Sequence, residues 1–439
     1  MFEGRSYYSQ GQLRKAEESL DAARQTFLDA GDRAGAASAL NSLGGVLADQ
    51  QDITRAQRMY EQSLATSEEI GDRRSMSAAL NNLGVLLKDQ SRFAEALSAH
   101  QRSLALRREI GDRNWMAVSL SNIGVVFFEQ DRLADATTYY RESLSISREL
   151  GDKRGIVRAL HNLAIVQREM GQLANARAGF EESLALRATI GDVRGQVMGR
   201  VELGMVLLEQ GEIDAARASQ EEAMRLAGQA RLKPGEAQAR YQLGEIALAA
   251  GDLAEARRQH EQALALRQEM KETRTMLESQ VALAAIALED GRPAEAESQA
   301  QNVIGSLKET TVLRPEAELI TARARLARHD VTGASHALTT ARTSSTRTER
   351  VSLINDLTMT AAEVDMANGR AEEGRRRLNA LRPTLQQSGL VLSELKRRLL
   401  VLRMDQREAR DNVQRDSIAL ANDARARGAG LIAMRARTP

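Results

Sequence analysis

The sequence predicts an all-α solenoid of about ten antiparallel helix pairs, and three observations support this prediction. A pattern repeats every 40 residues over most of the chain. Inside each repeat, apolar residues recur three, four or seven positions apart, which is the spacing of amphipathic helices. The composition, with 3% aromatic residues, 28% charged residues and five prolines among 439, suits many helices with thin cores better than a sheet.

A Gly-Asp dipeptide marks the 40-residue period. It begins at Gly31, Gly71, Gly111, Gly151 and Gly191, and the same phase continues without it to residue 310, which makes seven windows. The glycine suits a left-handed residue that ends one helix, and the aspartate can cap the start of the next. We therefore expect two helices in each window of residues 31–310.

Two columns of small residues predict where the helices of a pair cross. The first column is Gly44, Gly84, Gly124, Ala164, Gly204, Gly244 and Ala284, and the second is alanine at 56, 96, 136, 176, 216, 256 and 296. Glycine within a helix costs about 0.5–1 kcal/mol relative to alanine, so its recurrence needs a compensating close contact.

These residues resemble the tetratricopeptide repeat. The shared pattern is Leu-Gly, then alanine twelve residues after the glycine, then a large residue, then serine or alanine. The 40-residue period is similar to the lengthened form found in kinesin light chains and in arrays attached to bacterial serine/threonine kinases and transcriptional regulators. The resemblance implies a right-handed superhelix with the first helix of each pair on the concave face.

The amino-terminal end departs from the regular pattern. Gly11 and Ala16 match the start of a second helix, which places Gly4 in the glycine column. We therefore expect residues 1–30 to be a truncated first repeat and the chain to be a piece of a longer protein. Harmless fraying of residues 1–8 is the alternative.

The carboxyl-terminal third keeps the helical spacing of apolar residues but departs from the 40-residue phase. Residues 367–374 are similar in sequence to residues 249–256. We expect residues 311–439 to form degenerate helix pairs and a cap, with pairs in 311–346, 347–388 and 389–439.

Composition argues against several classes of protein. The formal net charge is +1 with acids and bases interleaved, so nothing marks the chain as a ligand for nucleic acid or an anionic membrane. The chain has no cysteine, which excludes a disulfide framework and fits a cytoplasmic location. The longest apolar run, residues 281–288, is too short to span a bilayer.

No catalytic signature is present in the sequence, so we expect neither an enzyme nor a cofactor. Phosphate-binding, dinucleotide, zinc-protease and serine-hydrolase motifs are all missing. His100 and His260 fall in the large-residue column, where packing is favoured over metal binding. Carboxylates also recur at Asp49, Asp89, Glu129, Glu169, Glu209 and Glu289, and they are expected to contribute solvation and charge towards a partner rather than acid–base catalysis.

The expected binding surface is the concave groove that the resemblance implies. Its candidate residues lie just before the Leu-Gly pair or within two turns after it, and they are Asn41, Asn81, Asn82, Lys88, Asn122, Arg158, His161, Asn162 and Arg168. A carboxamide donates and accepts hydrogen bonds at once, so the asparagines could hold the backbone of an extended peptide. The basic residues would suit an acidic segment. The alternative is that asparagine merely tolerates a helix near its start.

We therefore expect a non-catalytic scaffold or sensor module of a bacterial signalling or regulatory protein. Its partner would be a protein or peptide segment, not nucleic acid or membrane, and a kinase or DNA-binding domain would be attached or nearby. Two alternatives stay open: a stand-alone peptide-responsive regulator, and an enzyme whose site the known motifs do not show.

Overall fold

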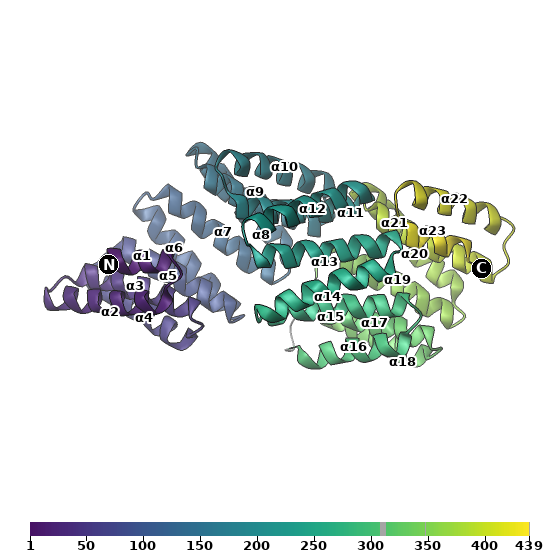
Figure 1. Ribbon diagram of the computed structural model, residues 1–439, viewed down its shortest axis with the longest axis horizontal. Coiled ribbons are helices and arrows are strands. Elements are labelled where there is room, and N and C mark those ends of the chain that lie inside the picture. The colour runs from purple at the N-terminus through teal and green to yellow at the C-terminus, as the bar shows by residue number, and fades with distance from the viewer. Residues whose placement is uncertain (308–312, 347, 439) are drawn as a thin grey trace. The chain divides into compact units, whose positions relative to one another are not determined.

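The computed structural model describes residues 1–307, 313–346 and 348–438, and it consists of helices joined by short turns (Figure 1). These described residues contain 23 helices and no strand, so the predicted α-solenoid is confirmed. The chain divides into two compact units, Met1–Asn162 and Leu163–Pro439, which we call unit 1 and unit 2 and describe separately.

Unit 1 is built from successive antiparallel helix pairs. Its helices are α1 (Phe2–Ser9), α2 (Leu13–Asp29), α3 (Arg33–Asp49), α4 (Ile53–Ile70), α5 (Arg73–Asp89), α6 (Phe93–Glu109), α7 (Arg113–Glu129), α8 (Leu133–Glu149) and the first part of α9 (Lys153–Glu169). The odd-numbered helices are the first helices of the pairs, and the even-numbered helices are the second.

Unit 2 continues the same alternation from within α9. Its further helices are α10 (Leu173–Thr189), α11 (Val193–Glu209), α12 (Ile213–Gln229), α13 (Lys233–Ala250), α14 (Leu253–Glu269), α15 (Thr273–Glu289), α16 (Pro293–Ser306), α17 (Leu313–Ala327), α18 (Val331–Ser344), α19 (Val351–Ala367), α20 (Ala371–Ser388), α21 (Val391–Arg407), α22 (Val413–Ala426) and α23 (Gly430–Arg437). The segment 389–439 thus contains three helices, whereas the sequence predicted a pair.

The Gly-Asp turns have the predicted geometry. Gly71 has a φ of 71° and ends α4 in the left-handed region. The Asp72 carboxylate then accepts hydrogen bonds from the backbone N–H groups of Arg74 (3.1 Å) and Ser75 (3.2 Å) at the start of α5. One dipeptide therefore ends a helix and caps the next.

The glycine column marks close crossings between the two helices of a pair, as predicted. A Cβ atom on Gly44 or Gly124 would lie 2.6 Å from the ring of the tyrosine sixteen residues later, and one on Gly84 would lie 2.7 Å from the His100 ring. Gly4 belongs to the same column, because its Cβ would lie 2.7 Å from Leu20. Large buried side chains fill the space that these glycines leave open.

Unit 2 folds back on itself, because its late helices begin against the turns of its early repeats. Each contact joins residues about 180 positions apart: a Cβ on Gly171 would meet Val351, one on Gly211 would meet Val391, and one on Gly251 would meet the backbone of Leu431. Apolar cores extend from these contacts and join α11–α13 with α21–α23, which lie beside each other in Figure 1. A second core joins α10 and α11 with α19–α21.

Candidate functional site

The first helices of unit 1 present a continuous surface that we call the first-helix face. It consists of partly or fully exposed positions on α3, α5 and α7 that recur at 40-residue spacing, and these are Ser38, Ser42, Gly45, Asp49, Ala78, Asn82, Val85, Asp89, Val118, Asn122, Val125 and Glu129. Positions three, four and seven apart lie on one side of a helix, so each helix contributes a stripe. The stripes are mostly polar or small.

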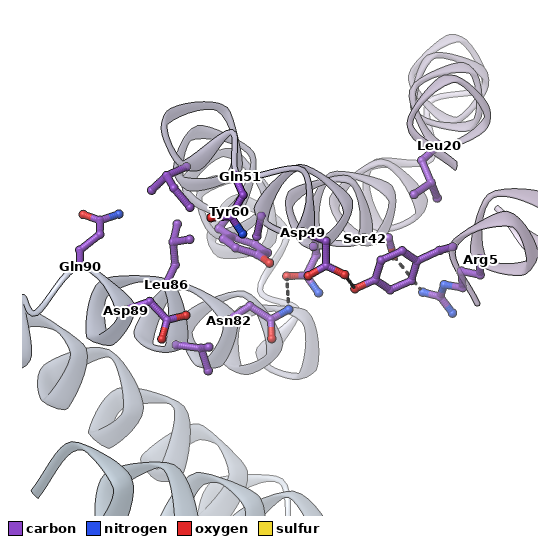
Figure 2. Close-up of a pocket in the computed structure, with 16 residues that line it drawn as sticks. Arg5, Leu20, Ser42, Asp49, Gln51, Tyr60, Asn82, Leu86, Asp89 and Gln90 are labelled. Carbon is purple, nitrogen blue, oxygen red and sulfur yellow. Dashed lines mark hydrogen bonds between the residues drawn. The ribbon is translucent and has the colours of Figure 1, made fainter. Parts of the chain in front are cut away.

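A pocket of about 900 Å³ lies on this face between α1, α3 and α5 (Figure 2). Arg5 and Tyr8 line it from α1, Asp49 from the end of α3, and Asn82 and Asp89 from α5. Its lining is therefore rich in hydrogen-bonding groups and carries charges of both signs.

Two polar side chains of α1 hold this helix against one side of the pocket. The Arg5 guanidinium donates to the hydroxyls of Ser38 and Ser42, each at 3.4 Å. The Tyr8 hydroxyl donates to Asp49 Oδ2 at 2.7 Å (Figure 2). Partial burial and the Asp49 carboxylate raise the pKa of Tyr8 to about 12, so this hydroxyl remains a donor at neutral pH.

The predicted asparagines bond to one another in a chain across three helices. Asn122 Nδ2 donates to Asn81 Oδ1 at 2.8 Å, and Asn81 Nδ2 lies 3.4 Å from Asn82 Oδ1. Asn82 Nδ2 in turn donates to Asn41 Oδ1 at 3.0 Å. Each carboxamide has two N–H groups and two acceptor positions, so these bonds orient the amides while leaving them capacity for a ligand.

The remaining predicted residues of unit 1 lie along the same face or beside it. Lys88 is half-buried, and its ammonium group lies 2.6 Å from Asp89 Oδ1. On α9, Arg158 is exposed, and His161 and Asn162 are half-buried. The positive charge of Lys88 is thus already compensated by a neighbouring carboxylate.

Arg168 is the one predicted site residue that lies in unit 2. Its side chain is only 12% exposed and forms ion pairs with Glu169 (2.6 Å), Glu209 (3.4 Å) and Glu202 (3.7 Å). Carboxylates of the same unit therefore supply the counter-charge that the sequence analysis expected from an acidic partner.

Sequence reasoning missed the contribution of α1 to the pocket. Arg5 and Tyr8 stand 40 residues before Gly45 and Ala48, which also line the pocket, so the repeat register itself places them at equivalent positions of a first helix. The signal was present, but treating residues 1–30 as a truncated repeat hid it. Asp49 was noted only as a member of the carboxylate column.

Two family models cover nearly the whole chain. Residues 144–425 match the MalT-like TPR region, and residues 3–69 and 75–149 match the tetratricopeptide repeat. The chain belongs to the tetratricopeptide-repeat family. The resemblance drawn from the Leu-Gly and alanine columns is thereby confirmed.

Several solved structures share this tetratricopeptide-repeat fold. A Rap protein complexed with competence and sporulation factor has a TM-score of 0.57 and 15% identity, with 81% of this chain and 99% of that chain covered. The apo quorum sensor NprR from B. thuringiensis has a TM-score of 0.55 and 14% identity, with coverages of 76% and 94%. Aspartyl phosphate phosphatase F from Bacillus subtilis has a TM-score of 0.55 and 11% identity, with coverages of 68% and 75%. No curated protein matches the sequence.

Among the residues that the structure describes, no group of three or more histidine, aspartate and glutamate side chains is arranged to hold a metal ion. No helix in the described ranges combines the length and the apolar character needed to cross a bilayer.

Proposed function

We propose that this tetratricopeptide-repeat chain is a non-catalytic sensor or scaffold that binds an extended peptide segment on the first-helix face of unit 1. The observation that carries the proposal is the chain of asparagine carboxamides beside the pocket, which joins Asn122, Asn81, Asn82 and Asn41. Carboxamides held in fixed orientations are suited to a peptide backbone, which offers one donor and one acceptor per residue.

The spacing of the helices suits an extended segment. Packed helices lie about 8–10 Å apart, and an extended chain advances about 3.3 Å per residue. A segment that crosses α3, α5 and α7 would therefore meet Asn41, Asn82 and Asn122 at about every third residue. Asn82 and Asn122 stand 40 residues apart, and Asn162 on α9 continues this series, which we call the asparagine column.

Unit 2 is a poorer candidate for such a segment, because its own side chains use the equivalent positions. Arg168 is engaged by three carboxylates. Leu208, which follows it in the column, packs against a core that contains residues of α21–α23. The first-helix face of unit 1 carries a pocket instead.

The similar structures support a signalling role for this fold. One is a Rap protein in complex with competence and sporulation factor, and another is described as a quorum sensor. We propose that the chain acts as a sensor module beside an attached or neighbouring kinase or DNA-binding domain, with a stand-alone peptide-responsive regulator as the second candidate. A cytoplasmic location and the absence of catalysis belong to the same proposal.

The test is to replace the asparagine column and measure binding and folding separately. A variant with Asn82→Ala, Asn122→Ala and Asn162→Ala should bind a segment isolated by pull-down about 10- to 1,000-fold more weakly, since each lost hydrogen bond costs about 0.5–1.5 kcal/mol. Asn114→Ala is the matched control, because Asn114 is an exposed asparagine at the start of α7 and lies outside the column.

The structure also sets the expected cost to folding. Asn122→Ala removes the donor to Asn81, which is 7% exposed, so the variant should lose about 1 kcal/mol of stability. Binding is therefore compared well below the unfolding midpoint. Parent-like affinity of the triple variant, or cross-links confined to the second helices, would refute the proposal.

A further inference from the structure

The carboxylate column has an unfavourable position in the first helices. Asp49, Asp89 and Glu129 are the last residues of α3, α5 and α7. The carboxyl end of a helix carries a partial negative charge, which repels an acidic side chain and attracts a cation. Three successive first helices thus end in the charge that their own dipoles disfavour.

In unit 2 the same column is neutralised by arginines. Glu169 forms ion pairs with Arg168 at 2.6 Å and with Arg350 at 3.1 Å. Glu209 pairs with Arg168 at 3.4 Å, and Glu289 pairs with Arg435. Two of these arginines come from distant parts of the chain, since Arg350 directly precedes α19 and Arg435 lies in α23.

The equivalent carboxylates of unit 1 are less enclosed. Asp49 is exposed and accepts its hydrogen bond from the uncharged Tyr8 hydroxyl. Asp89 pairs with Lys88 at 2.6 Å but keeps 56% of its side chain exposed, whereas Glu169 keeps 8%, and Glu129 is half-buried at the end of α7. Asp49 and Asp89 line the pocket of about 900 Å³, and Asn82 lies on the same helix as Asp89 (Figure 2).

We infer that the segment bound by unit 1 is basic, and that its arginine or lysine side chains pair with Asp49, Asp89 and Glu129. These side chains would occupy the place that Arg350 and Arg435 take in unit 2. The inference rests on the proposed function and names the chemistry of its partner. It is opposite in sign to the acidic segment expected from Lys88 and Arg168. Arg168 is paired with carboxylates, and in the Lys88–Asp89 pair the carboxylate is the more exposed partner.

The test uses fluorescein-labelled, amino-terminally acetylated nine-residue peptides of the form (Ala-Ser-X)₃, which place X at every third residue. X is arginine, lysine, glutamine or glutamate, and a fifth peptide has X as glutamine and a free amino terminus. At low salt, the arginine and lysine peptides should bind the full chain about 10-fold or more tightly than the acetylated glutamine peptide, with an advantage that shrinks as salt rises. Preference for the free amino terminus alone would instead assign the pocket to a terminal ammonium group and overturn the side-chain assignment.

A matched pair of variants locates the effect. Asp49→Asn, Asp89→Asn and Glu129→Gln together should abolish the arginine advantage, so that the arginine and acetylated glutamine peptides bind this variant with equal affinity. Asp29→Asn, Glu61→Gln and Glu109→Gln change the net charge equally at exposed positions of the second helices and should preserve the advantage.

The outcomes separate the two proposals. Equal binding of all the peptides, lost in the asparagine triple variant, overturns the charge inference and leaves the proposed function standing. Tightest binding of the glutamate peptide also overturns the inference, in favour of an acidic partner. An arginine advantage that survives in the asparagine triple variant, with unchanged affinity, supports the charge inference and refutes backbone recognition by the asparagines.

Discussion

Gly84→Ala tests whether the glycine column is a steric contact. The new Cβ would lie 2.7 Å from Cε1 and Nε2 of His100, whereas ordinary carbon contacts begin near 3.4 Å. His100 is 1% exposed, so its ring cannot move aside into solvent. Overpacking of this kind costs about 1–3 kcal/mol, and alanine regains about 1 kcal/mol of helix propensity. We expect a net loss of about 1 kcal/mol.

The effect should change sign when the ring is removed. In a His100→Ala background the added methyl group has room, so Gly84→Ala should stabilise the protein by about 0.5–1 kcal/mol through helix propensity alone. The double-mutant cycle then reports a coupling of about 2 kcal/mol between the two positions. Gly45→Ala is the control, because Gly45 lies in α3 of the same unit and its Cβ would meet only the Tyr60 hydroxyl at 3.7 Å, an ordinary contact, so it should stabilise in every background.

Urea unfolding followed by tryptophan fluorescence is the appropriate assay. Trp115 is the only tryptophan of the chain and lies in unit 1, as do Gly84 and His100. Its signal therefore reports the unit in which the substitution is made. A stabilising effect of Gly84→Ala in the parent background, or a cycle without coupling, would refute the argument that the column is a close helix crossing.

Three further predictions concern charge and backbone strain. Burial, with a smaller effect of Lys88, lowers the pKa of His100 from 6.5 to about 4. The contribution of the neutral ring to the free energy of unfolding should therefore be fully present above about pH 6.5 and fall by up to about 3 kcal/mol towards pH 4. Urea unfolding at pH 7 and pH 5 checks this, and a His100→Gln variant should show a weaker dependence of stability on pH. Arg231 has a φ of 55°, so Arg231→Gly should raise stability by about 1 kcal/mol in thermal unfolding, and a loss would show that its side chain matters more than its backbone. Asp49→Asn, Asp89→Asn and Glu129→Gln together should raise the free energy of unfolding of unit 1 in urea by about 1–3 kcal/mol, because each relieved helix end contributes about 0.3–1 kcal/mol. An unchanged free energy of unfolding would mean that these carboxylates are already compensated.

The sequence could predict the features that depend on neighbours within one repeat. Gly71 and Asp72 determine the turn between helices through local backbone geometry, and Gly84 pairs with a residue only sixteen positions later. Contacts of this range recur in every window, so the period reveals them. The helix content and the helix crossings could be predicted from the sequence for this reason.

Contacts between repeats were harder to predict from the sequence, because they depend on the curvature of the stacked helix pairs. The asparagine column was visible, but its internal hydrogen bonds join residues 41 positions apart and depend on the rotation between successive pairs. The approach of Leu431 to Gly251 depends on the accumulated curvature of more than four repeats. The sequence of a single 40-residue window does not specify that accumulated curvature.

One column of the repeat therefore meets two different environments. A carboxylate at the end of a first helix is an electrostatic cost wherever it stands alone. Unit 2 offsets this cost internally, because its folded-back helices bring Arg350 to Glu169 and Arg435 to Glu289. In unit 1, Asp49 accepts a hydrogen bond from the uncharged Tyr8 hydroxyl, and Asp89 keeps 56% of its side chain exposed although it pairs with Lys88. The carboxylate column thus helps to close unit 2 upon itself, and in unit 1 it leaves a surface that favours a basic segment from another molecule.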